Sequence, residues 1–231
     1  MTMKMGKKIH DLPELRNRVH VFKDRPDAGK VLSRMLKHYR HTDALVLAVP
    51  AGGVAVASVL SKELDLRLDL AVVSKITLPW NTEAGYGAVA FNGTVLLNEA
   101  FLSRLHLSDE EIRKGIKQTE EKVARRLKLF RGDRPLPDLR GPILLVDDGL
   151  ASGFTLRTAA KALREAECQR IIVAVPTAHL DAAEMILEEA DEIYCPNVRS
   201  GLSFAVADAF EYWSDLDEEE VLGILADSTT R

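Results

Sequence analysis

The sequence of 231 residues predicts an α/β protein built on an open parallel sheet flanked by helices. Two observations carry this prediction. The run ALVLAVP at residues 44–50 is apolar throughout and stops at a proline, which is typical of a strand buried on both faces. Similar apolar runs at 68–74, 143–146 and 170–176 alternate with segments of helical periodicity. This alternation indicates βαβ units, whose strands are parallel.

The first half of the chain supplies a helix, a strand, a helix and a strand in that order. Residues 27–40 place their apolar side chains on one helical face. A second helix follows the first strand, and the run 68–74 completes the unit. Residues 75–98 replace this pattern with Pro79 and three glycines, which predict a flexible loop leading into a hairpin around Asn92-Gly93.

The second half opens with a long helix. Ser108 and Glu111 have the spacing of a capping box, so we expect a helix over 108–131, with a narrow apolar stripe that fits packing on its own domain or on a partner. Helices at 155–166 and 180–189 and a short strand at 191–195 follow. We therefore expect one domain over 1–231, with an N-terminal arm (1–25), the flexible loop and hairpin (75–98), the long helix (108–131), and a C-terminal hood and tail (196–231).

The composition excludes several classes of protein. Hydrophobic residues make up 46% of the chain, but no apolar run approaches the roughly 20 residues that span a bilayer. No apolar stretch follows the basic N-terminus, so a secretory signal is not predicted. Cys168 and Cys195 lack the spacing of a zinc site and are too few for a disulfide framework. We expect a cytoplasmic protein with two reduced thiols and no membrane contact.

The charge is unevenly distributed. Residues 1–40 carry eleven basic and four acidic residues, a balance of +7, against −11 for the rest of the chain, which together give the net charge of −4. A basic arm of this kind could contact nucleic acid, but no recognition motif accompanies it. A solvated arm, or one that packs on the acidic C-terminal segment, is the simpler interpretation.

The stretch ILLVDDGLASGFT, residues 143–155, carries the strongest functional signal. Asp147 and Asp148 end a buried strand, where carboxylates are costly unless they have a use. In open α/β sheets, ligands bind outside such strand ends, and the next helix points its N–H groups there. The small residues of the turn would let the backbone wrap a phosphate, while the carboxylates accept hydrogen bonds from neighbouring hydroxyls. Ribose 5-phosphate has this layout, although an acidic turn before an ordinary helix start is the plainer alternative.

Other phosphate-binding motifs do not fit. No lysine follows Gly153, which excludes a Walker A loop, and the turn PAGGVAVA lacks the G-x-G-x-x-G spacing of dinucleotide-binding folds. The stretch resembles instead the PRPP-binding motif of type I phosphoribosyltransferases, where PRPP is phosphoribosyl pyrophosphate. The resemblance implies catalytic roles for Asp147 and Asp148 on the ribose hydroxyls, and a Mg²⁺ ion held mainly by substrate and water, with contacts to both aspartates. It implies PRPP binding by Gly149, Leu150, Ala151, Ser152, Gly153, Phe154 and Thr155.

The resemblance also assigns residues outside this motif. It implies a flexible loop that closes over the reaction, in which Glu83 is a candidate base, and a hood whose Phe204 stacks on the acceptor base. Phe204 is equally explained as core packing. The residues that the resemblance implies for pyrophosphate are the turn Ala51, Gly52 and Gly53 and the cations Lys75, Arg131 and Arg134, each of which could also be a surface cation.

Nearly the whole chain is similar to a group of bacterial and archaeal phosphoribosyltransferase-like proteins with the motifs FxDRxxAG, PRGG, LVDDGxATG and WYxDF. The chain departs from this group at three positions. Ala51 and Ser74 replace arginines, and Ser152 replaces a threonine. Each lost cation would weaken pyrophosphate binding by about 1–3 kcal/mol if it contacts that group.

The resemblance leaves the acceptor open. Ala151 stands where enzymes for 6-oxopurines have an aspartate base, and Ser203 stands before Phe204 where they have a lysine, so we expect poor activity on hypoxanthine and guanine. Adenine and non-purine acceptors stay open. Three hypotheses follow: a Mg²⁺-dependent phosphoribosyltransferase, a regulator that binds PRPP without turnover, and a phosphosugar enzyme that performs hydrolysis or phosphorolysis. A homodimer is compatible with each, and the absence of a helix-turn-helix pattern argues against DNA binding.

Overall fold

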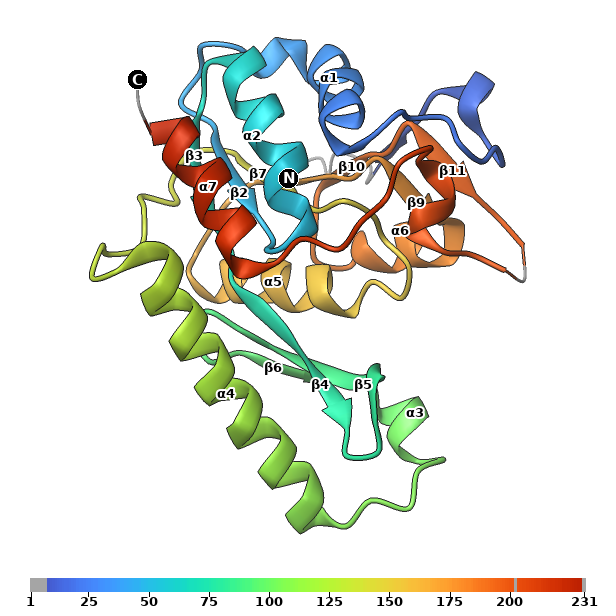
Figure 1. The fold of residues 1–231 in the computed structure, drawn as a ribbon, viewed down its shortest axis with the longest axis vertical. Helices are drawn as coiled ribbons and strands as arrows, with labels where there is room; N and C mark the ends of the chain where they lie inside the picture. Colours follow the sequence, from blue (N-terminus) through green and yellow to red (C-terminus); the bar gives the residue numbers. More distant parts are fainter. Residues whose placement is uncertain (1–7, 202, 230–231) are drawn as a thin grey trace, which may run out of the picture.

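The computed structural model describes residues 8–201 and 203–229, without the side chains of residues 82, 83 and 229. At its centre is a six-stranded sheet in the order β1-β10-β8-β7-β2-β3, in which every pairing is parallel (Figure 1). The predicted open parallel sheet is therefore confirmed. Its strands are β1 Lys8–His10, β2 Leu45–Ala48, β3 Arg67–Leu70, β7 Ile143–Val146, β8 Ile171–Ala174 and β10 Glu192–Tyr194.

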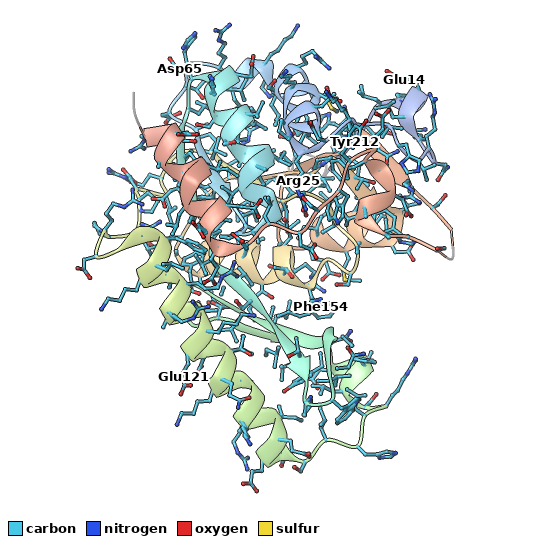
Figure 2. All side chains as sticks on the ribbon, viewed as in Figure 1. Glu14, Arg25, Asp65, Glu121, Phe154 and Tyr212 are labelled. Atoms are coloured by element: carbon cyan, nitrogen blue, oxygen red, sulfur yellow. The ribbon has the colours of Figure 1, made fainter. Side chains whose placement is uncertain are left out.

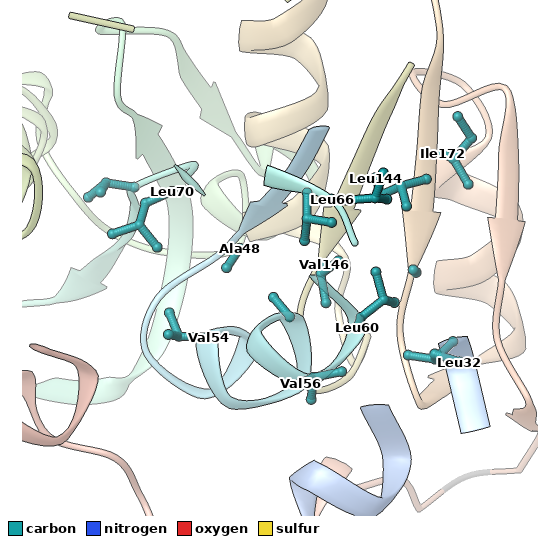
Figure 3. Packing of buried hydrophobic residues seen from close by; sticks show 14 of the residues in the cluster. Leu32, Ala48, Val54, Val56, Leu60, Leu66, Leu70, Leu144, Val146 and Ile172 are labelled. Carbon is teal, nitrogen blue, oxygen red and sulfur yellow. The ribbon is translucent and has the colours of Figure 1, made fainter. Parts of the chain in front are cut away.

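Helices cover both faces of this sheet. Successive residues of a strand point to opposite faces. In β7, Leu144 and Val146 therefore pack in one hydrophobic core with α1 and α2 (Figure 3), while Ile143 and Leu145 pack in a second core with α5 and α6. Because both faces are covered, the central strands have to be apolar throughout. The helices are α1 Arg25–Met35, α2 Gly52–Leu64, α5 Phe154–Glu165 and α6 Leu180–Ile186. In the described part of the chain, no helix has the length and apolar character needed to cross a membrane.

The run 68–74, predicted as one strand, belongs to two strands in two sheets. β3 ends at Leu70, although the Ala71 N–H still donates to the Ala48 carbonyl at 2.9 Å. The chain then leaves the parallel sheet as β4, Val73–Leu78, which pairs antiparallel with β5, Asn81–Ala90. Residues 70–74 are buried on both sides of this break, so their apolar composition does not reveal the change of sheet. The prediction of one continuous strand was wrong for this reason.

Residues 75–98 form most of a three-stranded antiparallel sheet in the order β4-β5-β6, where β6 is Val95–Leu97. The predicted hairpin is confirmed: it joins β5 to β6, and Gly93 has a φ of +87°. Where a loop was predicted before the hairpin, the structure has strands β4 and β5, and Gly85 and Gly87 lie inside β5. A Cβ at Gly87 would lie 2.6 Å from the Leu96 carbonyl oxygen, so a close approach of the strands requires glycine there.

The long helix α4, Asp109–Arg131, begins at the predicted capping box. The Ser108 hydroxyl accepts a hydrogen bond from the Glu111 N–H at 3.3 Å, and the Glu111 carboxylate accepts one from the Ser108 N–H at 2.8 Å. The narrow apolar stripe of α4 packs on β4 and β5, so it is covered within the chain. Figure 1 shows α4, the short helix α3 (Glu99–Leu102) and the antiparallel sheet projecting together from the main sheet.

The region predicted as the hood, residues 196–231, packs with β9 and with residues near the N-terminal end of the chain, and we use the name hood for this group below. β9, Thr177–His179, pairs in parallel with β11, Asn197–Arg199, and Phe22 pairs with Phe210 beside them. The predicted N-terminal arm thus contributes β1 and a part of the hood within the described residues. The chain ends in α7, Glu218–Thr229, which packs on α2. Short 3₁₀ helices in the described chain are η1 Pro13–Leu15, η2 Lys37–Tyr39, which continues the predicted helix 27–40 beyond α1, and η3 Val206–Ala209.

Candidate active site at the carboxyl edge of the sheet

The acid pair lies at the edge where the parallel strands end. Asp147 and Asp148 follow β7, which pairs with β2 on one side and β8 on the other. Both residues are partly exposed, and the Asp147 Oδ1 atom accepts a hydrogen bond from the Asp148 N–H at 2.9 Å. The two carboxylates therefore face the part of an open α/β sheet where ligands bind.

Burial disturbs the ionisation of both acids in this pair. Burial raises the pKa of Asp147 well above the ordinary value for aspartate, and the negative charge of Asp148 raises it further. Burial also raises the pKa of Asp148, but the charge and hydrogen bond of Arg25 oppose that rise. Asp148 therefore keeps its negative charge more readily than Asp147.

Arg25 provides a cation at the acid pair. Its side chain is 8% exposed, and its Nε atom donates a hydrogen bond to Asp148 Oδ2 at 2.9 Å. Its Nη1 atom donates to the Ser214 carbonyl at 2.7 Å, and its guanidinium carbon lies 3.8 Å from the ring centroid of Trp213. Figure 2 places Arg25 in the middle of the molecule, beside α1 and α2. The FxDRxxAG motif contains this arginine, but the motif alone gives it no role.

The turn that follows β2 touches the acid pair because it contains glycines. A Cβ on Gly52 would lie 1.7 Å from Asp148 Oδ2, and a Cβ on Gly53 would lie 2.8 Å from the Val146 carbonyl oxygen. The preceding peptide bond, Pro50–Ala51, is cis. β2 and β7 are neighbours, so the turns after them leave the sheet side by side. The structure thus brings together the two turns to which the resemblance gave pyrophosphate and ribose phosphate.

Two helices begin at this edge without a side-chain N-cap. α2 follows Ala51 and α5 follows Gly153, and in neither helix does the N-cap side chain accept a hydrogen bond from the first turn. By contrast, α1, α3, α4 and α6 have side-chain caps from Asp24, Asn98, Ser108 and His179. The first N–H groups of a helix have no partner within it and carry partial positive charge. At α2 and α5, no capping side chain competes with an anion for these groups.

One part of the loop 149–155 contacts the hood. Leu150 is buried, and its N–H and carbonyl group form 2.9 Å hydrogen bonds with Thr177 and His179 at the two ends of β9. Gly149 lies against Val206, because a Cβ there would come within 2.4 Å of the valine side chain. These contacts fix the loop beside the hood.

The remaining part of this loop leads into α5. Ala151 and Ser152 are exposed, and Gly153 has a φ of +78°, a left-handed conformation that glycine adopts without strain. Phe154 and Thr155 form the first turn of α5 and are half-buried. In Figure 2, Phe154 lies on the side of α5 that faces β4 and β5.

Two of the predicted pyrophosphate cations lie elsewhere. Arg131, the last residue of α4, is buried, forms an ion pair with Asp69 of β3, and donates to the Pro135 carbonyl. Arg134 donates from its Nε atom to the Arg131 carbonyl at 3.1 Å. These contacts fasten the end of α4 to an edge strand of the main sheet, so the structure does not bring either arginine to the acid pair.

Three further candidates lie on the antiparallel sheet. Lys75 is exposed on β4, and its side chain crosses Gly85, where a Cβ would lie 2.2 Å from the Lys75 Cγ atom. Ser74, which the sequence comparison above expected to be arginine, is buried, and its hydroxyl has no hydrogen-bond partner. Glu83 belongs to β5, but its side chain lies outside the described part of the structure.

Phe204 lies in the hood, two residues before Val206, which contacts Gly149 of the loop 149–155. Its ring is half-buried between two side chains that no sequence motif identifies. The Arg199 guanidinium carbon lies 5.0 Å from the ring centroid, and the His179 ring meets the phenyl ring edge-on at 5.8 Å. Arg199 is itself held by Asp208 at 3.1 Å. The hood therefore offers an aromatic ring with a cation beside it.

The donor set at the acid pair can be compared with that of a metal centre. Within residues 8–201 and 203–229, no three His, Cys, Asp or Glu side chains are grouped so as to hold a metal ion. The acid pair offers carboxylate oxygens, one of which accepts from Arg25. Such a set does not enclose an ion, but it fits Mg²⁺, which commonly binds through one or two carboxylates, water and substrate phosphates.

Comparison with known proteins agrees with this geometry. The sequence profile of the phosphoribosyl transferase domain family matches residues 23–208. Proteins from two strains of Mycobacterium tuberculosis, provisionally named phosphoribosyl transferases, are 31% identical over 206 residues, which is 89% of this chain and 46% of theirs. The chain thus spans about half the length of the curated relatives it matches. The crystal structure of TT1426 from Thermus thermophilus is 29% identical with a TM-score of 0.71, over 89% of this chain and 98% of that one.

Proposed function

Because the chain belongs to the phosphoribosyl transferase domain family, we propose that it transfers a 5-phosphoribosyl group from PRPP to a nitrogen of a base or amine and releases pyrophosphate. One observation carries the proposal. Two helices without side-chain N-caps, α2 and α5, start at one sheet edge with the acid pair between them. PRPP carries a phosphate at one end, hydroxyls in the middle and pyrophosphate at the other end, which suits this order of groups.

Each part of the edge then has a role. Residues 151–153 and the first turn of α5 bind the 5-phosphate through backbone N–H groups and the hydroxyls of Ser152 and Thr155. The turn 51–53 and the first turn of α2 bind the pyrophosphate through their backbone N–H groups. Asp147 and Asp148 accept hydrogen bonds from the ribose hydroxyls that lie between the two phosphate groups.

The reaction breaks one bond and forms another at C1 of the ribose. The acceptor nitrogen attacks C1, the bond from C1 to the pyrophosphate oxygen breaks, and pyrophosphate leaves with the electron pair. Positive charge develops on the ribose during this step, and the nearby Asp147 and Asp148 carboxylates stabilise it. A bound Mg²⁺ would offset the charge of the leaving pyrophosphate, and the two aspartates would hold it through water. The acceptor loses a proton, for which Glu83 is the candidate base, and unchanged turnover in E83Q would remove it from that role.

The acceptor site is proposed in the hood. Phe204 would stack on the acceptor base, with Arg199 at the side of the ring. Ala151 provides no carboxylate to accept the proton of a 6-oxopurine, so hypoxanthine and guanine are expected to be poor acceptors. Adenine and non-purine acceptors are compatible with this position, and efficient conversion of hypoxanthine or guanine would overturn the assignment.

A second candidate is a regulator that binds PRPP without turnover. Ala51 and Ser74 favour it, because the group that the sequence resembles is expected to have arginines at these two positions. A buried Ser74 and a neutral Ala51 leave less positive charge to stabilise a leaving pyrophosphate. The same protein would still bind the ribose and the 5-phosphate.

The test is pyrophosphate release from PRPP and Mg²⁺ over a panel of nucleobases and simple amines. Release with one acceptor would support the transferase and identify its substrate. Release without any acceptor would indicate hydrolysis, and binding without release would indicate the regulator. The D147N/D148N variant is the blank, because it should neither bind PRPP nor release pyrophosphate.

We also propose that the reaction takes place in the cytoplasm. Cys168 and Cys195 are buried and do not form a disulfide, which is typical of a reducing compartment. A homodimer is still a prediction, and size-exclusion chromatography with light scattering would test it.

A further inference from the structure

Arg25 connects the two ends of the chain to the acid pair, although it belongs to neither phosphate-binding turn. We propose that Arg25 is a positioning residue, which holds the Asp148 carboxylate in the orientation that receives a ribose hydroxyl, and that Trp213 holds Arg25 in turn. This inference rests on the proposed function, because it concerns the same PRPP site.

The guanidinium group of Arg25 forms hydrogen bonds along its edge and stacks on an aromatic ring with its face. On its edge, Nε donates to Asp148 at 2.9 Å and Nη1 donates to the Ser214 carbonyl at 2.7 Å. On its face, the Trp213 ring lies 3.8 Å away. A planar cation held in two directions has one orientation, and a lysine ammonium could not reproduce both contacts.

Gly52 also lies against the Asp148 carboxylate. A Cβ at Gly52 would lie 1.7 Å from Asp148 Oδ2 and 3.2 Å from Arg25 Nε. The carboxylate thus occupies the space that a side chain would take and contacts the arginine at the same time. A group held in this way needs little reorganisation when a ligand binds, which is the advantage of a preorganised site.

The segments that carry Arg25 and Trp213 are joined to each other. Phe22 pairs with Phe210, their ring centroids lie 5.7 Å apart, and the Phe210 and Trp213 centroids lie 5.1 Å apart. The Tyr212 N–H also donates to the Lys23 carbonyl at 2.9 Å. Residues 22–25 and 210–214 therefore form one aromatic support beneath the arginine.

The position of Arg25 also affects the charge that a ligand meets. Two adjacent carboxylates would repel a ligand with phosphate groups at both ends. Arg25 offsets the charge of Asp148, while the Asp147 carboxylate accepts from the backbone N–H of its own turn. The acid pair therefore still offers oxygen atoms that accept hydrogen bonds, while its net negative charge is smaller. This suits a ligand that is both anionic and rich in hydroxyls.

The test measures the Kd of PRPP in the presence of Mg²⁺ by isothermal titration calorimetry. R25Q should weaken binding about tenfold or more, because Asp148 loses its charged partner and its fixed orientation. R25K should recover only part of this loss, since it restores the charge but not the stacking. W213L should weaken binding less than R25Q, and W213F, which keeps an aromatic ring, should lie close to the wild type.

R126Q is the matched control. Arg126 is also buried, lies 5.4 Å from the Phe130 ring centroid and 3.4 Å from the Glu218 carboxylate, and connects α4 to the C-terminal helix. Its loss removes an ion pair and an aromatic contact away from the acid pair, so PRPP affinity should not change. A melting curve for each variant shows whether it is folded, and W213L carries the test if R25Q does not fold.

A double variant separates positioning from direct contact. If Arg25 acts through Asp148, R25Q/D148N binds PRPP no more weakly than D148N alone. Losses that multiply in the double variant, or an R25Q variant that binds like the wild type, would overturn the inference while the proposed function stands. A folded wild type that binds no PRPP would overturn the proposed function, and this inference with it.

Discussion

The helices α4 and α5 start in opposite ways. α4, with 23 residues, opens with a complete capping box in which Ser108 and Glu111 satisfy each other's backbone N–H groups. α5, with 12 residues, opens at Gly153 in a left-handed conformation and has no side-chain cap. Both helices pack on the antiparallel sheet, but only α5 begins in the loop that follows the acid pair.

The comparison shows which helices lack the stabilisation of a side-chain N-cap. A good N-cap contributes about 1 kcal/mol, and α2 and α5 both lack a side-chain cap at the same sheet edge. A ligand phosphate would supply the missing hydrogen-bond acceptors at these two places. We therefore expect α2 and α5 to bind the phosphate groups of the ligand through their first N–H groups.

The largest effect on PRPP binding is expected from the acid pair, which lies between the first turns of α2 and α5. D147N/D148N should weaken PRPP binding by at least about 100-fold, because the ribose hydroxyls lose two charged acceptors. Calorimetric titration with PRPP and Mg²⁺ measures this loss. D109N/E110Q, which removes two acids from the start of the capped helix α4, should bind like the wild type. Affinity retained in D147N/D148N would contradict the assignment of the acid pair.

A glycine comparison should give the next largest effect. In G52A, the new Cβ would need the place that Asp148 Oδ2 occupies, so the carboxylate has to move and PRPP binding should fall about tenfold. G223A is the control, because Gly223 of α7 has open space around its Cβ position and alanine favours a helix. G223A should keep full affinity and unfold at a higher temperature. Equal affinity of the two variants would refute the close approach of the turn 51–53 to Asp148.

D147N should stabilise the empty protein at neutral pH. The pKa of Asp147 is raised on folding by burial and by Asp148. An acid of this kind stabilises the fold most below the ordinary pKa of aspartate, and this contribution is lost as pH rises through the raised value. Asparagine avoids the loss, so the advantage of D147N in urea unfolding should be present at pH 7 and should shrink as the pH falls to about 4. Lower stability of D147N at pH 7 would be the contrary result.

The smallest effect concerns the capping box itself. S108A should lower the free energy of unfolding by about 1 kcal/mol, because the first turn of α4 loses its side-chain acceptor. Its PRPP affinity should equal that of the wild type. A loss of affinity in S108A would mean that the start of α4 takes part in binding, which would blur the distinction between the two kinds of helix start.

Features governed by neighbouring residues were predictable from the sequence. The hairpin turn at Gly93, the capping box at Ser108 and the acid pair after β7 each depend on a few consecutive residues, and the structure has all three in place. The central strands were predictable too, because burial on both faces leaves a continuous apolar run. The prediction of one strand over 68–74 was wrong for the same reason, since residues buried in two successive sheets are apolar on both sides of the break between them.

Features governed by distant contacts were not predictable. Arg25 meets Asp148 across 123 positions of sequence, so no local pattern identifies it as part of the site. Arg131 was a candidate for pyrophosphate binding because the sequence does not show which acid a basic residue pairs with. Its partner in the structure, Asp69, lies 62 positions away. Arg199 and His179 beside Phe204 depend likewise on the pairing of β9 with β11.

Backbone amide NMR would test the central claim most directly. We predict that PRPP with Mg²⁺ shifts the amide signals of residues 52–54 and 152–155, and that ribose 5-phosphate, which lacks the pyrophosphate, shifts only the second set. The amides of residues 109–111, at the capped start of α4, should not move with either ligand. Unchanged signals at both α2 and α5, or equal shifts at α4, would contradict the assignment of the two helix starts to the phosphate groups of PRPP.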